Sequence, residues 1–266
     1  MSGHWYFDPL LIGGIVTLAL VYFLLTGPLR GRYAPGAAFP KRKAALFYAA
    51  VVILYLAEGS PLHDLAERSS FSAHMVQHML LSYIVPTLML RGLPDWLVRP
   101  VLTHPRVLPV AKVLTHPVVA FSIFSLFFSL WHIPVVYEGA LTNPRLHHAE
   151  HVAFLFTAVL LWWPLLSPLR ELPRLPYSGA LVYLFLLPIA QLPVFAAVTF
   201  ADGSIYPTYA NAPHVMFGDA RMDQTLGGAL MKLGGLFTFG VPFIVTFFEW
   251  YREENTAHYR KRAPVS

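Results

Sequence analysis

Residues 72–90 read SAHMVQHMLLSYIVPTLML, an apolar run long enough to cross a membrane as a helix. Within it, His74 and His78 are four residues apart and therefore share one helical face. Met75 and Met79 form a second stripe, rotated by about 100° from the first. Because polar side chains are costly inside a bilayer, two histidines one turn apart indicate a functional site. Imidazole and thioether ligands suit copper, especially Cu(I), better than magnesium or calcium.

The composition is typical of a membrane protein. Of 266 residues, 56% are hydrophobic and 12% are charged, which is about half the charged fraction of an average soluble domain. We predict an all-α, polytopic membrane protein with one seven-helix transmembrane domain, residues 1–250, and a basic, disordered cytoplasmic tail, residues 251–266. The predicted transmembrane helices cover residues 7–27, 44–60, 72–90, 117–136, 150–169, 178–200 and 223–249. The first is expected to be a retained anchor, because no basic region of a signal peptide precedes it.

The distribution of basic residues predicts the orientation of the chain. If the loops alternate between the two sides of the membrane, 15 of the 19 Lys and Arg residues lie on one side. The loops of the opposite side hold only Arg68, Arg145 and Arg221. The positive-inside rule then places the N-terminus outside and the C-terminus in the cytoplasm. The net charge of +5 therefore reflects membrane topology, and no nucleic-acid partner is expected.

With this orientation, most of the histidines fall near the outer face. Nine of the 12 do so: His4, His63, His74, His78, His132, His147, His148, His151 and His214. The chain contains no cysteine, so a soft metal ion would have to be held by histidine and methionine, with help from a carboxylate. The sequence therefore predicts a metal site at the outer ends of several helices.

Three further segments contribute candidate ligands at a similar depth. His132 ends the fourth predicted helix, and His147 and His151 share a face at the start of the fifth. Asp223 opens the seventh helix, where it is also compatible with a simple helix cap. Each single histidine is also compatible with an ordinary hydrogen bond between helices, and Glu150 is expected to orient one of them. The predicted metal ligands are His74, His78, His132, His147, His151, Met75, Met79 and Asp223.

Lys232 lies about 13 Å from the outer end of the seventh predicted helix, at the helical rise of 1.5 Å per residue. A lysine at this depth is expected to face a polar cavity or another polar group. Gly227, Gly228, Gly234 and Gly235 flank it and predict close packing against neighbouring helices.

Taken together, these motifs resemble a known family. They are His74-Met75-x-x-His78-Met79 followed by Leu80, Trp131-His132-x-Pro134, His147-x-x-x-His151 and Asp223-Gln224-x-x-Gly227-Gly228, in this order along the chain. The sequence is similar to the CtaG-type (caa3-type) cytochrome c oxidase assembly factors, which are seven-span membrane proteins of bacteria. The resemblance extends from the first predicted helix to about Trp250.

The resemblance implies a role in the maturation of a haem–copper oxidase, in which copper, as Cu(I), is delivered to the oxidase copper centre or staged for it. It implies no turnover chemistry, so the protein is not expected to be an enzyme. Cytochrome c oxidase subunits, an extracytoplasmic copper donor and membrane lipid are the implied partners. The implied location is the bacterial cytoplasmic membrane, which the chain would cross several times.

Three other functions are compatible with parts of the sequence. A b-type cytochrome would use His78 with His132 or His151 as axial haem ligands, although Met and Leu side chains crowd these positions. A copper transport protein would need ligands through the whole membrane, and the inner half offers methionines but no histidine pair. A rhodopsin-like photoreceptor would use Lys232 for a retinal Schiff base, but the third predicted helix has no carboxylate to serve as its counter-ion.

Overall fold

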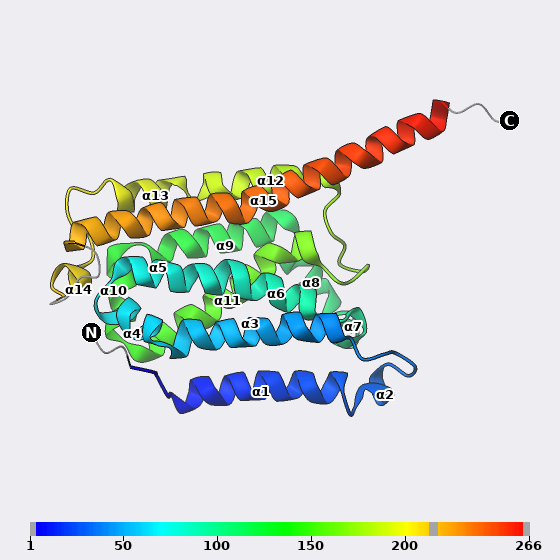
Figure 1. The fold of residues 1–266 in the computed structure, drawn as a ribbon, viewed down its shortest axis with the longest axis horizontal. Helices are drawn as coiled ribbons and strands as arrows, with labels where there is room; N and C mark the ends of the chain where they lie inside the picture. The colour runs from blue at the N-terminus through cyan, green and yellow to red at the C-terminus, as the bar shows by residue number, and fades with distance from the viewer. Residues whose placement is uncertain (1–3, 213–217, 263–266) are drawn as a thin grey trace.

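The computed structural model describes residues 4–212 and 218–262, and every regular element in these ranges is a helix (Figure 1). The first half contains α1 (Pro9–Thr26), α2 (Arg30–Tyr33), α3 (Lys41–Gly59), α4 (Pro61–Arg68), α5 (Phe71–Met79), the π-helical η1 (Leu80–Ile84), α6 (Val85–Gly92), α7 (Asp95–Leu102) and α8 (Leu108–Leu114). The second half contains α9 (Pro117–Trp131), α10 (Pro134–Thr142), α11 (Pro144–Leu166), α12 (Tyr177–Ala190), α13 (Leu192–Thr199), α14 (Pro207–Ala210) and α15 (Ala220–Arg262). The prediction of an all-α fold is confirmed for the described part of the chain.

Four helical segments are long and apolar enough to cross a membrane: α1, α11, the α12–α13 segment and α15 as far as Thr256. Two bent pairs raise the number to six if each pair is one span, namely α3 with α4, bent by 44°, and α8 with α9, bent by 63°. The third predicted span corresponds to α5, η1 and α6, which follow one another and are each shorter than 18 residues. The count of seven spans and the orientation of the termini stay predictions.

The interruption between α5 and α6 has a local cause. Pro86 has no N–H group, so the carbonyl of Ser82 lacks the partner that it would have in a regular helix. That carbonyl instead accepts a hydrogen bond from the indole nitrogen of Trp162 at 3.0 Å. Over Leu80–Ile84 the helix widens into a π-helical turn, a distortion that is frequent at functional sites. The wide turn begins immediately after the segment that carries the two histidines of α5.

Two predicted boundaries shift in the structure. α11 begins at Pro144, before residue 150, because Asn143 caps its first turn and proline suits the first helical position. His147 and His151 therefore both lie within a regular helix. α15 continues to Arg262, so residues 251–262 are helical where the sequence predicted the disordered tail to begin. This segment is rich in Glu, Arg and Lys, which are favourable in helices.

The close packing of α15 through glycine, which the sequence predicts, is confirmed. A Cβ atom on Gly227 would overlap the ring of Phe71 at the start of α5. A Cβ atom on Gly234 would overlap the end of Met79 at the other end of α5. Because these positions have no side chain, the backbone of α15 lies directly against the helix that carries His74.

We expect Gly227→Ala to lower the apparent melting temperature of the detergent-purified protein. The added methyl group would force the fully buried Phe71 or the α15 backbone to shift, at a cost of about 1–3 kcal/mol. Gly240→Ala on the same helix is the matched control, because a Cβ there meets nothing within 4 Å. The control should leave the melting temperature unchanged or raise it. Equal melting temperatures for the two variants would contradict the close contact.

Candidate metal centre

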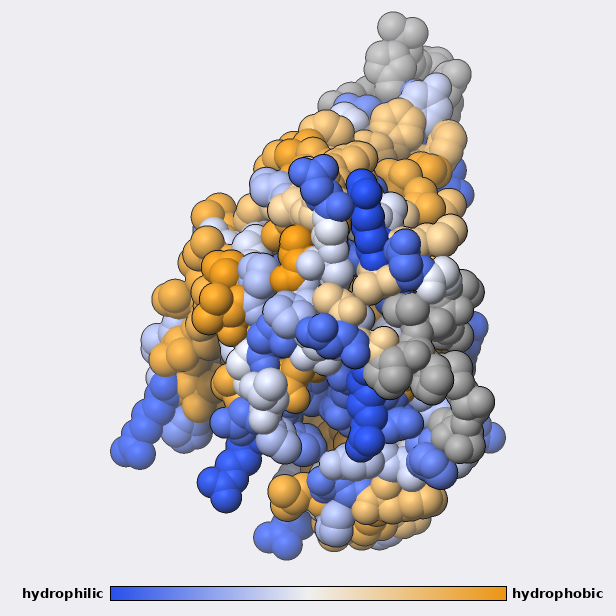
Figure 2. All heavy atoms as spheres, turned by 90° about the vertical axis from the view of Figure 1, so that its left-hand side faces the viewer, coloured by the Kyte–Doolittle hydropathy of each residue, from blue (hydrophilic) through white to orange (hydrophobic). Residues whose placement is uncertain are grey.

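Polar side chains concentrate at the end of the bundle where α5 and α11 begin. Figure 1 shows α4, α10, α14 and the start of α5 at this end, and Figure 2, which faces it, shows hydrophilic side chains gathered over it with hydrophobic ones along the flanks. Five histidines meet here, and none is more than 6% exposed. We call these histidines and three neighbouring glutamates the histidine cluster: Glu58, His63, Glu67, His74, His78, His147, Glu150 and His151.

Two helices that begin at the same end bring their histidine pairs to the same depth. Within each pair the spacing of four residues puts both rings on one helical face. The ring centroids are 4.3 Å apart for His74 and His78 and 4.1 Å apart for His147 and His151. The pairs face each other across the helix interface, with 5.3 Å between the rings of His78 and His151. This part of the predicted ligand set is therefore assembled as one group.

His74, His78 and His151 form the most deeply buried set of potential ligands. Each offers one ring nitrogen within 4.8 Å of the others, and the Nε2 atoms of His74 and His78 are 2.8 Å apart. The Nδ1 of His151 donates a hydrogen bond to the Glu58 carboxylate at 2.8 Å. Its Nε2 therefore carries the lone pair of the neutral ring, and it is buried without a hydrogen-bond partner. A carboxylate on the far nitrogen of a histidine is the usual support for a metal ligand.

Tyr209 in α14 determines which ring nitrogen of His74 carries the proton. The Tyr209 hydroxyl donates a hydrogen bond to the carbonyl of Ala66 at 2.6 Å and lies 3.2 Å from the Nδ1 of His74. Burial raises the pKa of Tyr209, so the hydroxyl keeps its proton. Because that proton is used by Ala66, the His74 Nδ1 must donate to the tyrosine oxygen. The His74 Nε2 is then left with a lone pair on the side of His78.

A second set of potential ligands lies at the solvent-facing edge of the cluster. The Oε1 atom of Glu67 is 2.8 Å from the Nε2 of His63 and 2.9 Å from the Nε2 of His147. The contact with His147 is not aligned as a hydrogen bond, and both ring nitrogens of His147 are buried without a hydrogen-bond partner. The Glu67 side chain is 30% exposed, so this set is the part of the cluster that solvent reaches.

Glu150 lies between the two sets. Its carboxylate is 1% exposed, and its oxygens lie 3.7 Å from the Nε2 of His78 and 3.6 Å from the Nδ1 of His147. With His147 and His151 it forms a third group of ligand atoms within 4.8 Å of one another. Its Oε1 has no hydrogen-bond partner. Buried polar atoms without partners are rare in folded proteins, so this concentration of them indicates a binding site.

Three of the predicted ligands lie beside the cluster instead of within it. Met75, Met79 and His132 line a small cavity together with His78. The Nδ1 of His132 donates a hydrogen bond to the carbonyl of Phe128 at 2.7 Å. Its Nε2 is buried and has no hydrogen-bond partner. These residues and the cluster therefore make two separate polar compartments that share His78.

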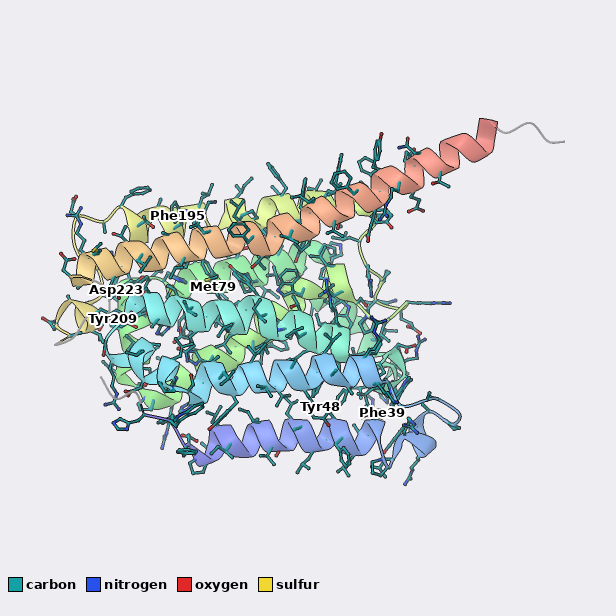
Figure 3. All side chains as sticks on the ribbon, in the orientation of Figure 1. Phe39, Tyr48, Met79, Phe195, Tyr209 and Asp223 are labelled. Carbon is teal, nitrogen blue, oxygen red and sulfur yellow. The ribbon has the colours of Figure 1, made fainter. Side chains whose placement is uncertain are left out.

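Asp223 lies outside the cluster and caps α5. Its carboxylate accepts hydrogen bonds from the backbone N–H groups of Phe71 and Ser72, at 2.6 and 3.3 Å, and from the hydroxyls of Ser70 and Ser72. These bonds join the start of α15 to the start of α5 (Figure 3). Both carboxylate oxygens accept hydrogen bonds here, which agrees with the helix cap that the sequence also allowed, and the role of Asp223 as a metal ligand stays a prediction. The helix that it caps is not its own, which local sequence reasoning does not reveal.

Four members of the cluster were not among the predicted ligands: Glu58, His63, Glu67 and Glu150, of which Glu150 was expected to orient a histidine. α4 bends back by 44° from the end of α3 and presents His63 and Glu67, four residues apart, to α11. That spacing is the sequence signal that could have identified His63 and Glu67. His214, which the sequence also assigns to the outer face, lies outside the described residues.

Lys232 lines a small cavity with Gln191, which agrees with the prediction that it faces a polar group. Its ammonium group also lies over the ring of Phe195, 5.9 Å from the centroid. This is a cation–π contact, which offsets part of the cost of burying the charge.

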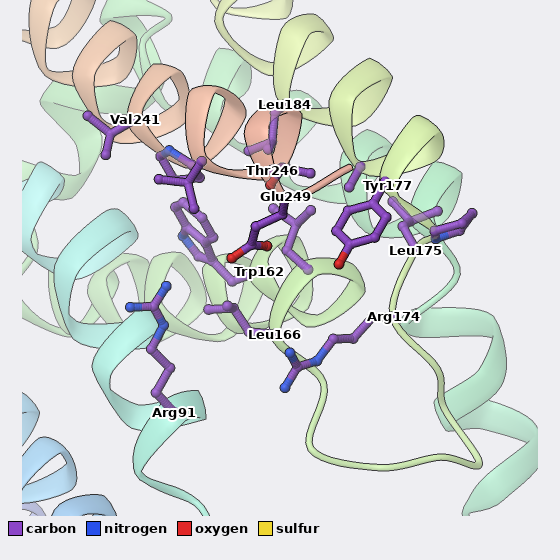
Figure 4. Close-up of a pocket in the computed structure, with 15 residues that line it drawn as sticks. Arg91, Trp162, Leu166, Arg174, Leu175, Tyr177, Leu184, Val241, Thr246 and Glu249 are labelled. Carbon is purple, nitrogen blue, oxygen red and sulfur yellow. The ribbon is translucent and has the colours of Figure 1, made fainter. Parts of the chain in front are cut away.

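The opposite end of the bundle holds a larger cavity with a different lining. It measures about 690 Å³ and is lined by Arg91, Trp162, Arg174, Tyr177 and Glu249, among others (Figure 4). Its lining has no histidine or methionine and only one carboxylate. Among the described residues, the groups able to hold a metal ion are therefore confined to the histidine end.

Comparison with known proteins gives uncharacterized relatives that are longer than this chain. An uncharacterized protein of Mycobacterium bovis and one of Mycobacterium tuberculosis are each 26% identical over 249 residues, which cover 85% of this chain and 36% of theirs. An uncharacterized protein of Mycobacterium leprae is 23% identical over 273 residues, which cover 97% of this chain and 41% of its own length. The chain thus spans less than half the length of these relatives. No solved structure matches it.

A family comparison covers most of the chain. The family described as cytochrome c oxidase caa3 assembly factor (Caa3_CtaG) matches residues 20–253. The matched region includes the complete histidine cluster, the cavity beside it and the cap formed by Asp223. The resemblance seen in the sequence motifs is thereby confirmed, and the chain belongs to the Caa3_CtaG family of cytochrome c oxidase assembly factors.

Proposed function

We propose that the protein binds copper in the histidine cluster and passes it to cytochrome c oxidase while the oxidase copper centre is assembled. The observation that carries this proposal is the His74, His78 and His151 set, whose ring nitrogens lie within 4.8 Å of one another. The His151 Nε2 in this set has no hydrogen-bond partner, although it is buried. Family membership supports the oxidase as the recipient.

The chemistry of the donor set supports copper as the cargo. Imidazole nitrogens with one or two carboxylates favour late first-row metals, and among the divalent ions Cu(II) binds such sites most tightly. Two or three imidazoles also suit the low coordination numbers of Cu(I). Magnesium and calcium would require six or more oxygen ligands, which the cluster does not offer.

The arrangement supports capture and release from one end. Glu67 is the partly exposed member, and the histidines behind it are all buried. An ion arriving from solvent would first meet Glu67 with His63 and His147, and then the inner histidines. A partner protein docked at this end would meet the same residues in the reverse order.

The shape of the cavities favours this function over a b-type cytochrome. A haem held by two histidines needs a wide slot with one histidine on each face of the macrocycle. The cavity flanked by His78 and His132 has about the size of one water molecule. A larger cavity of about 280 Å³ lies beside the cluster. The histidines that line it, His148 and His151, belong to the same helix.

The side chains packed between the cluster and the opposite end of the bundle favour delivery of copper to a partner over transport of copper across the membrane. Tyr83, Trp162 and Phe239 fill the space between the small cavity and the large cavity at the opposite end. Phe239 stacks on Trp162 with 5.6 Å between the ring centroids and meets Tyr83 edge-on at 5.2 Å. All three residues are buried, so this aromatic layer closes the path of an ion toward the opposite end.

We expect the double variant His74→Ala/His78→Ala to lose tight Cu(I) binding while it stays folded, because it removes two of the three innermost ligands. Copper content and Cu(I) titration of the detergent-purified protein would measure the loss. His148→Ala is the matched control, since His148 lies on the same end of α11 but is 41% exposed. Unchanged copper stoichiometry in the double variant would contradict the proposed site.

Glu58→Gln should weaken copper binding without removing a ligand. The amide cannot hold His151 as the carboxylate does, and loss of such a supporting group lowers metal affinity by about 10–100-fold. A competition titration against a Cu(I) chelator would measure the change. Glu249→Gln, at the opposite end of the bundle, should leave the affinity unchanged. Equal affinities in the two variants would show that His151 is not a ligand.

In cells that depend on this protein, the His74→Ala/His78→Ala variant should yield cytochrome c oxidase that lacks copper and is inactive. Metal analysis of the purified oxidase and its oxygen consumption would be compared with those from cells carrying His148→Ala. Full copper loading of the oxidase with the double variant would rule out delivery by the cluster.

A further inference from the structure

The small cavity beside the histidine cluster has an unusual lining. It lies between α5, the end of α9 and α15, and it has about the size of one water molecule. Its lining residues with nitrogen or sulfur ligand atoms are Met75, His78, Met79, His132 and Met231, and the hydroxyl-bearing Ser82 and Tyr83 also line it. No carboxylate lines it.

Two buried imidazole nitrogens belong to this cavity and have no partner. His132 donates through Nδ1 to a backbone carbonyl, so its Nε2 carries a lone pair. The Nδ1 of His78 is likewise buried without a hydrogen-bond partner. Both residues are only 6% exposed. Leaving two acceptors unsatisfied is costly, so a ligand that binds both nitrogens would be favoured in this cavity.

The soft potential ligands of the cavity are thioethers. Three of the seven methionines of the chain line this one cavity, two from α5 and one from α15. Thioether sulfur is a soft ligand that selects Cu(I) over Zn(II) and over the harder divalent ions. The histidine cluster, by contrast, combines imidazoles with carboxylates and is the harder of the two compartments.

We propose that this cavity is a second metal site, specific for Cu(I), in which the Nδ1 of His78, the Nε2 of His132 and the thioethers of Met75, Met79 and Met231 are the ligands. The inference rests on the proposed function, because copper reaches the cavity through the histidine cluster. It adds a soft inner site to the harder outer one.

His78 links the two sites and cannot serve both at once. A neutral imidazole has one protonated and one unprotonated nitrogen. When Nδ1 carries the lone pair and binds the inner ion, Nε2 is protonated and donates to the Nε2 of His74, which lies 2.8 Å away. When Nε2 binds an ion in the cluster, the proton is on Nδ1. The tautomer of His78 therefore determines which compartment it supports.

X-ray absorption at the copper edge tests the inner site directly. The full-length protein in detergent would be loaded with one equivalent of Cu(I), with ascorbate as a thiol-free reductant. Because the chain has no cysteine, any sulfur bound to copper must come from methionine. The expected spectrum contains both sulfur and nitrogen scatterers.

The variant Met79→Leu/Met231→Leu should reduce the sulfur contribution to that of Met75 and lower the Cu(I) affinity about 10-fold or more. Leucine has nearly the volume of methionine, so the fold should persist, and the melting temperature checks this. Met222→Leu is the matched control, because Met222 also lies on α15 but is 62% exposed. The control should keep the sulfur scatterers.

The outcomes separate this inference from the proposed function. Copper bound with nitrogen and oxygen only, in wild type and variants alike, would overturn the inner site and leave the cluster as the copper site. A sulfur contribution that is undiminished in Met79→Leu/Met231→Leu would also overturn it. Failure of the wild-type protein to bind any copper would overturn both proposals.

Discussion

Polar groups that are buried among apolar helices must find partners, and this constraint governs the whole histidine end of the bundle. Five imidazoles and three carboxylates lie there within hydrogen-bonding or ion-pairing reach of one another. Glu58 binds His151, and Tyr209 binds His74, and these contacts favour one tautomer of each ring. Several other ring nitrogens, including the Nε2 of His151 and of His132, remain buried without a partner. These unsatisfied groups are the basis of the two proposed metal sites.

The position of the α5 histidines and of the nearby methionines in the bundle depends on the contact between α5 and α15. The Asp223 carboxylate caps the first turn of α5, and glycines of α15 allow the two backbones to touch. This junction brings Met231 beside the methionines of α5 and fixes the register of His74 and His78 relative to α11. A residue that resembles a metal ligand in the sequence therefore contributes by holding the ligand-bearing helix in place.

The two proposed sites differ in hardness and share His78. The partly exposed carboxylate of Glu67 lies at the solvent-facing edge, the imidazoles lie behind it, and three thioethers line the cavity next to His78. Such an order would favour Cu(I) as an ion moves inward. An aromatic layer of Tyr83, Trp162 and Phe239 ends this series, which is consistent with an assembly factor that stores and returns its cargo on one side.

The amino-acid sequence by itself determined the helical class, the segregation of basic residues and the pairs His74–His78 and His147–His151, because helical periodicity and membrane hydropathy are local properties. It also determined the family, through motifs whose order along the chain is specific. Only the tertiary structure decided that Asp223 caps a neighbouring helix, that Glu58 and Glu67 join the cluster, and that His132 lines a different cavity. These outcomes depend on the bend after α3 and on helix contacts between residues up to about 150 positions apart, which no local pattern encodes.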